Sequence, residues 1–169
     1  VAIAATRPAE MTTASGTSSY SVTTAGDDIT LDEISTYTGA VSFNAAGVGS
    51  DVSLTNANLD LNLGAATVGG TYTVETDNGG IIDSGIVAVS GDASFTTTNT
   101  DDDIDLNLLA VAGKLALNTT GTTGNATVVN TTDIDFAASN VGGNLTATAT
   151  TQDITDTGTV TIAGATTLT

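Results

Sequence analysis

The feature that most constrains this sequence is that it repeats itself. The stretch Val68–Gly91 aligns without a gap with Val141–Gly164 over 24 positions, and the glycines and aliphatic residues agree while most other positions differ. Seven glycines precede an alternating pair of residues, at successive spacings of 23, 31, 21, 22, 30 and 21. This order of spacings predicts a superrepeat of about 74 residues with three units, one of which carries an insertion of roughly nine residues. The glycines are Gly16, Gly39, Gly70, Gly91, Gly113, Gly143 and Gly164, and the insertions fall in Ala45–Ala57 and Thr119–Thr131.

Each unit has the pattern of two short strands. After most of the seven glycines the apolar residues alternate with polar ones, as at Val41 and Phe43, which is typical of a strand with one buried face. A second strand begins about ten residues before the glycine, as at Asp103 before Gly113. No window has a sustained 3.6-residue apolar period or an apolar run of about 18 residues, so we expect no transmembrane helix and essentially no α-helix.

Units this short cannot bury a core alone, but stacked coils cover one another's apolar faces. The sequence therefore predicts an all-β parallel β-helix, or solenoid, of about seven coils, with 21–23 residues per coil and a longer coil every third. We assign residues 16–169 to a single β-helix domain and residues 1–15 to an N-terminal extension or cap. The alternative is a chain of immunoglobulin-like β-sandwich repeats, in which so short a sub-repeat has no role.

Composition limits the chemistry open to the chain. There is no His and no Cys, which leaves no Ser–His or Cys–His nucleophile and no imidazole or thiolate metal site. A net charge of −17 argues against nucleic acid and anionic lipid as partners, because both bind through Lys and Arg. Paired carboxylates hydrolyse glycosides in some enzymes, but three tyrosines and one lysine are too few to line a sugar cleft. We therefore expect no enzymatic activity.

An acidic series is the sharpest chemical feature. Ile104 and Leu106 alternate with acidic residues, so we expect the acidic side chains on the outer surface. Stacked coils would place such carboxylates in one row, about 5 to 10 Å apart, where like charges repel. Calcium, which takes about six to eight oxygen ligands, would relieve that repulsion, and a solvated acidic face screened by salt is the alternative. The candidate calcium ligands are Asp101, Asp102, Asp103, Asp105, Asp133 and Asp135.

The repeat V-G-G-N-L-T-A-T followed by D-I-T-D-T-G-T-V-T-I-A-G resembles the repeats of filamentous haemagglutinin-type surface proteins and of giant bacterial β-strand-repeat adhesins. The resemblance extends from about Gly16 to Thr169. It implies a right-handed β-helix, secretion through an outer-membrane partner or autotransporter route, and a role in adhesion, biofilm or filament formation. We recognise no counterpart of that family's large N-terminal secretion domain in these residues, so we expect a body segment of such a protein or a small relative.

These observations favour a secreted structural protein of a bacterial cell surface, a subunit or segment of a filament or adhesin. Leu168 aligns with Phe95, after which a coil continues, so the last coil would expose strand edges and apolar core. We expect this end to be covered head to tail by a second copy or by flanking repeats, and Val1–Ser15 to complete a partner's coil. The alternative is a calcium-dependent carbohydrate-binding module that contacts host or matrix glycans. We expect no nucleic-acid partner and no membrane insertion.

Overall fold

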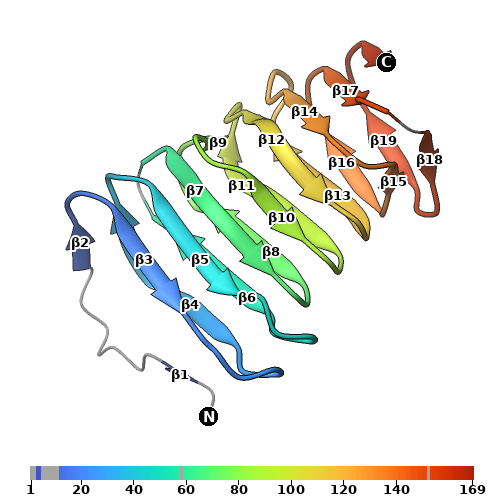
Figure 1. Cartoon of the computed structure of the whole chain (residues 1–169). Coiled ribbons are helices and arrows are strands. Elements are labelled where there is room, and N and C mark those ends of the chain that lie inside the picture. Colours follow the sequence, from blue (N-terminus) through green and yellow to red (C-terminus); the bar gives the residue numbers. More distant parts are fainter. Residues whose placement is uncertain (1–2, 5–11, 58, 152) are drawn as a thin grey trace.

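Two parallel β-sheets face each other across one apolar core. The computed structural model describes residues 3–4, 12–57, 59–151 and 153–169. Successive coils stack in one direction, so that the N-terminal coil (blue) and the C-terminal coil (red) lie at opposite ends (Figure 1). The fold is the predicted all-β parallel solenoid, with about 7 turns of ~21 residues each. The immunoglobulin-like alternative is wrong, because its sheets are antiparallel.

Within the described residues, one sheet has eleven strands and the other has nine. The eleven-stranded sheet contains β1 (Ile3–Ala4), β2 (Thr12–Ala14), β4 (Ile29–Tyr37), β6 (Val52–Asn56), β8 (Tyr72–Thr76), β11 (Ala93–Thr100), β13 (Lys114–Thr120), β15 (Ile134–Phe136), β16 (Ser139–Val141), β18 (Ile154–Asp156) and β19 (Val160–Ile162). The nine-stranded sheet contains β3 (Ser18–Ser21), β5 (Val41–Ala45), β7 (Leu61–Val68), β9 (Ile81–Asp83), β10 (Val87–Val89), β12 (Ile104–Val111), β14 (Ala126–Asn130), β17 (Leu145–Ala149) and β20 (Thr166–Leu168). Most coils cross each sheet once. The described residues contain no helix long and apolar enough to cross a membrane.

The prediction of a longer coil every third is wrong. Val41 pairs with Leu63 in the first of the two regions, and Ile104 pairs with Ala126 in the second. Both pairs have the same separation in sequence as Ala93 and Leu115, which pair outside these regions, so the coils there have ordinary length. The segments predicted as insertions contain β6 and β14, which are regular strands of the two sheets.

The two long spacings between repeated glycines correspond instead to about one and a half coils. At each of these two spacings the repeated glycine moves to a strand of the opposite sheet. The superrepeat therefore covers about three and a half coils, and each strand of the second superrepeat lies in the opposite sheet from its counterpart in the first. Gly16, Gly39, Gly143 and Gly164 precede β3, β5, β17 and β20 of the nine-stranded sheet, whereas Gly70, Gly91 and Gly113 precede β8, β11 and β13 of the eleven-stranded sheet.

The core shows the same crossing from one sheet to the other. The rings of Tyr20 and Phe43, both from the nine-stranded sheet, stack with centroids 5.8 Å apart. The ring of Phe43 then meets that of Tyr72 in the eleven-stranded sheet at 5.8 Å, and Tyr72 meets Phe95 at 5.9 Å. The interior therefore consists of two ladders that face each other. The residues four positions after five of the repeated glycines belong to these ladders and are all buried, namely Phe43, Val74, Phe95, Leu117 and Ala147.

Most of the repeated glycines are required by the close approach of neighbouring coils. A Cβ atom on Gly91 would lie 2.5 Å from the carbonyl oxygen of Gly70, and one on Gly113 would lie 2.3 Å from that of Gly91. Of the seven repeated glycines, Gly16 alone has a positive φ, at 101°. A left-handed bend therefore explains one of the seven positions, and contact between coils explains the others.

Candidate functional site

The six predicted calcium ligands do not form one row. Two lie at β12 on the nine-stranded sheet, two lie at β15 on the eleven-stranded sheet, and two lie in the corner between β11 and β12. Among the described residues, no group of three or more acidic side chains is placed to hold a metal ion. Calcium binding stays a prediction. The six predicted ligands lie in three separate parts of the surface. The pair at β12 is Asp103 and Asp105, the pair at β15 is Asp133 and Asp135, and the pair in the corner between β11 and β12 is Asp101 and Asp102.

On the nine-stranded sheet, the acidic position accepts a backbone hydrogen bond from the next coil. Asp103 Oδ1 accepts the N–H of Asn125 at 2.6 Å. Asn125 Oδ1 accepts the N–H of Asn144 at 2.9 Å, and Asn144 Oδ1 accepts the N–H of Ala165 at 2.8 Å. We call this run of side chains the corner ladder. Because asparagine takes the position in the two coils after Asp103, carboxylates do not follow one another there, and the predicted repulsion does not arise.

The eleven-stranded sheet carries an equivalent ladder. The carboxylate of Asp28 accepts the N–H of Asp51 at 2.8 Å, and Asp51 accepts the N–H of Thr71 at 2.6 Å. Further along, Asp92 accepts the N–H of Lys114 at 2.8 Å. Lys114 is the single lysine of the sequence, and it pairs in register with Asp135 of the following coil. The acidic side chains thus link coils through the backbone, which the sequence pattern did not reveal.

Two corner carboxylates each bind two successive backbone N–H groups. Asp101 has a φ of 67° and accepts from Thr122 at 3.0 Å and Thr123 at 2.9 Å, and these bonds hold its pKa below the ordinary value. Asp83 accepts from Asn107 at 3.0 Å and Leu108 at 2.8 Å. Desolvation by burial raises the pKa of Asp83, and the two hydrogen bonds oppose that rise.

A polar hollow of about 290 Å³ lies on the outer face of the nine-stranded sheet. It contains two of the predicted calcium ligands, Asp103 and Asp105, beside the amide side chains of Asn125 and Asn144. Asp103 Oδ1 is already hydrogen-bonded to Asn125, and Asp105 Oδ1 accepts from the side chain of Asn107. The hollow therefore offers oxygen atoms from three coils, and part of their hydrogen-bonding capacity is used within the protein.

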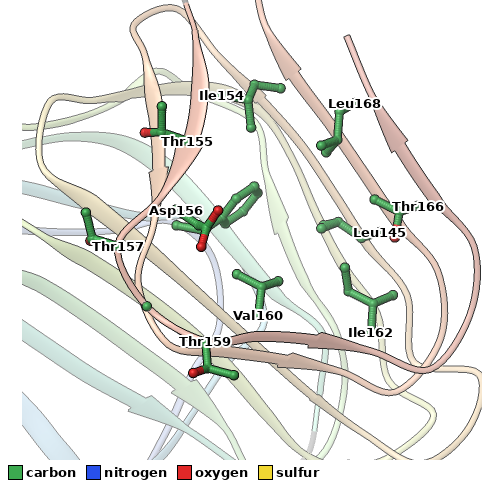
Figure 2. Close-up of a pocket in the computed structure, with 12 residues that line it drawn as sticks. Leu145, Ile154, Thr155, Asp156, Thr157, Thr159, Val160, Ile162, Thr166 and Leu168 are labelled. Atoms are coloured by element: carbon green, nitrogen blue, oxygen red, sulfur yellow. The ribbon is translucent and has the colours of Figure 1, made fainter.

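The C-terminal end of the stack contains a larger hollow of about 600 Å³. The side chains of Ile154, Val160 and Ile162 surround it together with Leu145 and Leu168 (Figure 2). Leu168 is 53% exposed. The prediction of exposed apolar core at this end is confirmed for the last described coil.

The predicted N-terminal extension is described in part. Residues 3–4 form β1 and residues 12–14 form β2, and both strands pair in parallel with β4. Residues 1–2 and 5–11 lie outside the described residues, so most of Val1–Ser15, which we expected to complete a partner's coil, falls there.

A repeat family matches the chain at residues 49–108 and 123–169, under the description "Repeats of unknown function (DUF5649)". The chain belongs to this family. The two DUF5649 matches begin one superrepeat apart. The first match starts just before β6 of the eleven-stranded sheet, and the second starts just before β14 of the nine-stranded sheet. The two DUF5649 matches therefore start on opposite sheets. No curated protein and no solved structure matches the chain.

Sequence analysis missed most of the polar contacts between coils of this DUF5649 chain. The buried amides of Asn56 and Asn130 lie one superrepeat apart and take the same role on opposite sheets. Asn56 Oδ1 accepts the N–H of Tyr37 at 2.9 Å, and Asn130 Oδ1 accepts the N–H of Val111 at 2.8 Å. The sequence did contain a signal for this role, because both asparagines end an alternating strand pattern at the same point of the superrepeat.

Proposed function

We propose that the chain is a structural part of an extracellular bacterial filament or adhesin, in which its coils stack end to end with further coils of the same repeat. The hollow of about 600 Å³ at the C-terminal end of the stack is the observation that carries this proposal. Ile, Val and Leu side chains line it together with Asp156 and four threonines, and covering the apolar part with another apolar surface is favourable.

The equivalent residues of the first superrepeat indicate what fits this end. Leu168 corresponds to Phe95, which is fully buried, and Ile154 corresponds to Ile81, which is also fully buried. In the first superrepeat these residues are covered by β12 and β13, which pair with β9 and β11. A strand pair of that kind, with aliphatic residues facing inward, is the matching cover for the end.

The strand edges favour the same occupant. Among the described residues β18, β19 and β20 each pair with a strand of the preceding coil and with no strand on the other side. An open parallel edge recruits a further strand, because its N–H and C=O groups lack partners. The end thus offers backbone hydrogen bonds around an apolar centre.

The opposite end has strands in the matching places. β1 and β2 pair with successive parts of β4 in the eleven-stranded sheet, and β3 lies at the edge of the nine-stranded sheet. Placing a second copy head to tail would set β1 and β2 on β18 and β19, and β3 on β20. Both sheets would then continue through the joint without a change of strand direction.

The surface location follows from charge and from family likeness. A chain with a net charge of −17 stays apart from nucleic acid and anionic lipid, and it suits a salty medium that screens its carboxylates. The repeat resembles those of secreted bacterial adhesins, which supports the same location.

Electron microscopy of the purified chain tests this proposal. Leu168→Asp places a charge in the end hollow, and Ile86→Asp is the matched control, because Ile86 is 62% exposed and does not line that hollow. We expect long uniform filaments from the wild type and from Ile86→Asp, and isolated short rods from Leu168→Asp. Short rods from the wild type, or filaments from all three proteins, would contradict head-to-tail stacking.

A second candidate is calcium-dependent carbohydrate binding at the polar hollow on the nine-stranded sheet. The hollow gathers Asp103, Asp105 and neutral amide oxygens on one exposed face, and oxygen atoms of this kind suit calcium. A glycan-array signal that disappears with chelator and with Asp105→Asn would support this function. A signal that survives both changes would count against it.

A further inference from the structure

In the corner between β8 and β9 an asparagine is followed directly by a glycine. Asn78–Gly79 is the single Asn–Gly pair of the sequence, and Asn78 is exposed. Gly79 has a φ of 111°, and a Cβ atom there would lie 2.3 Å from the carbonyl carbon of Leu59. Position 79 therefore accepts only glycine, and no side chain shields the backbone nitrogen that follows Asn78.

The next coil places two polar side chains on this pair. The N–H of Gly79 donates to Asp102 Oδ2 at 2.6 Å. Asn99 Nδ2 donates to Asn78 Oδ1 at 3.0 Å and to the same oxygen of Asp102 at 3.2 Å. A carboxylate thus touches the backbone N–H, and an amide donor touches the side-chain carbonyl that the nitrogen would attack.

We propose that this corner converts Asn78 to aspartate and isoaspartate through a succinimide. The nitrogen of Gly79 gives its proton to Asp102 and attacks Cγ of Asn78, while Asn99 donates to the oxygen that becomes negative. The bond from the nitrogen to Cγ forms, the bond from Cγ to Nδ2 breaks, and ammonia leaves with the transferred proton. Water then opens the five-membered imide at either carbonyl. The net reaction consumes one water and releases one ammonia, with no oxidant and no metal.

Other asparagines of the described chain lack this combination. In the corner ladder, Asn125 and Asn144 use Oδ1 to accept a backbone N–H from the next coil, and each is followed by a residue with a side chain. Asn56 and Asn130 are buried, so water does not reach them. Asn78 is the single asparagine followed by glycine, so we expect the reaction there, where it adds a negative charge between Asp77 and Asp102 in a single corner.

Peptide mapping by mass spectrometry of the full-length chain, after incubation near neutral pH, tests the proposal. Asp102→Asn is the decisive variant, because its amide oxygen still accepts the N–H of Gly79 but is no longer a base. We expect this variant to convert Asn78 on the order of tenfold more slowly than the wild type. Asn99→Ala should slow the reaction a few-fold, and Asp32→Asn, which removes the same charge from an exposed position of the distant strand β4, should leave the rate unchanged.

The pH dependence of the conversion rate distinguishes general-base catalysis by Asp102 from a turn that is only held in place by its hydrogen bonds. With a carboxylate as the base, the wild-type rate should stay nearly flat over the neutral range, whereas Asp102→Asn should rise about tenfold per pH unit as hydroxide takes over. Equal rates and equal slopes in the two proteins would overturn the proposal. So would slower conversion in the wild type than in a free peptide of residues 74–82, because the bond to Asp102 would then protect Asn78. Circular dichroism of both proteins shows whether the corner variant has kept its fold.

Discussion

The two stretches that repeat each other, Val68–Gly91 and Val141–Gly164, occupy different places in the fold. The first lies inside the stack, where Tyr72, Ile81 and Val87 are all fully buried. The second contributes to the last described coils, where Ile154 and Val160 are only half-buried. Stretches with the same pattern of glycine and aliphatic residues are thus fully buried in one place and half-buried in the other. Burial in a solenoid depends on the neighbouring coil as much as on the residue itself.

The two stretches also lie on opposite sheets. β8 belongs to the eleven-stranded sheet and its counterpart β17 to the nine-stranded sheet. Corner glycines, inward aliphatic residues and ladder side chains take the same roles in both. The sequence of one unit therefore specifies a strand and its corner, and the number of half-coils before it decides which sheet it joins.

The largest expected effect comes from truncating the paired positions Phe95 and Leu168. Phe95→Ala should lower the free energy of unfolding by about 3–5 kcal/mol, because it opens a cavity between two coils. Leu168→Ala should cost about 1 kcal/mol or less, because Leu168 is already 53% exposed. Urea unfolding of the two variants measures the difference. Equal losses would mean that the end coil is as well covered as the middle of the stack.

The fold was largely predictable, because period-two apolar residues in a short repeated unit allow few solutions other than stacked coils. The long interval between Gly39 and Gly70 led to the wrong coil length, since the pattern of one chain does not distinguish an insertion from an extra half-coil. Strand β6 in that interval reads V-S-L-T-N and has the alternating pattern. Pairing Val52 with Tyr72, one coil later, would have revealed the half-coil.

The acidic side chains were harder to interpret from sequence. Alternation placed Asp103 and Asp105 outside correctly, and both are exposed. Whether a carboxylate binds a cation, faces water or accepts a backbone N–H depends on the distance to the next coil, which the sequence does not contain. The replacement of aspartate by Asn125 and Asn144 at the same corner was the available signal, because asparagine keeps the acceptor and loses the charge.

A smaller effect, of opposite sign, is expected at Tyr72, whose counterpart in the second superrepeat is Leu145. The Tyr72 hydroxyl is buried with no hydrogen-bond partner among the described residues, and burial raises its pKa. Tyr72→Phe should raise the free energy of unfolding by about 1–2 kcal/mol, because it removes an unsatisfied polar group. Tyr20→Phe is the control and should be destabilising, since that hydroxyl meets the Tyr37 hydroxyl at 3.2 Å. A less stable Tyr72→Phe protein would show that the hydroxyl has a favourable interaction in the core.

The smallest expected effect concerns pH and again depends on whether a coil follows. Asp101 accepts two N–H groups from the next coil, and these bonds lower its pKa in the folded chain below the ordinary 3.8. A carboxyl with a lowered folded pKa stabilises the fold above its unfolded pKa, and that contribution is lost as the pH falls through the folded pKa. Asp101→Asn keeps the left-handed φ and one acceptor, so it should be less stable than the wild type near neutral pH and equally stable in strong acid. Asp156→Asn removes the same charge from β18, which pairs with β15 and with no second strand among the described residues, and should show no such convergence. Thermal midpoints across this pH range compare the three proteins. Parallel curves for the wild type and Asp101→Asn would mean that the two bonds at this corner do not depend on the charge.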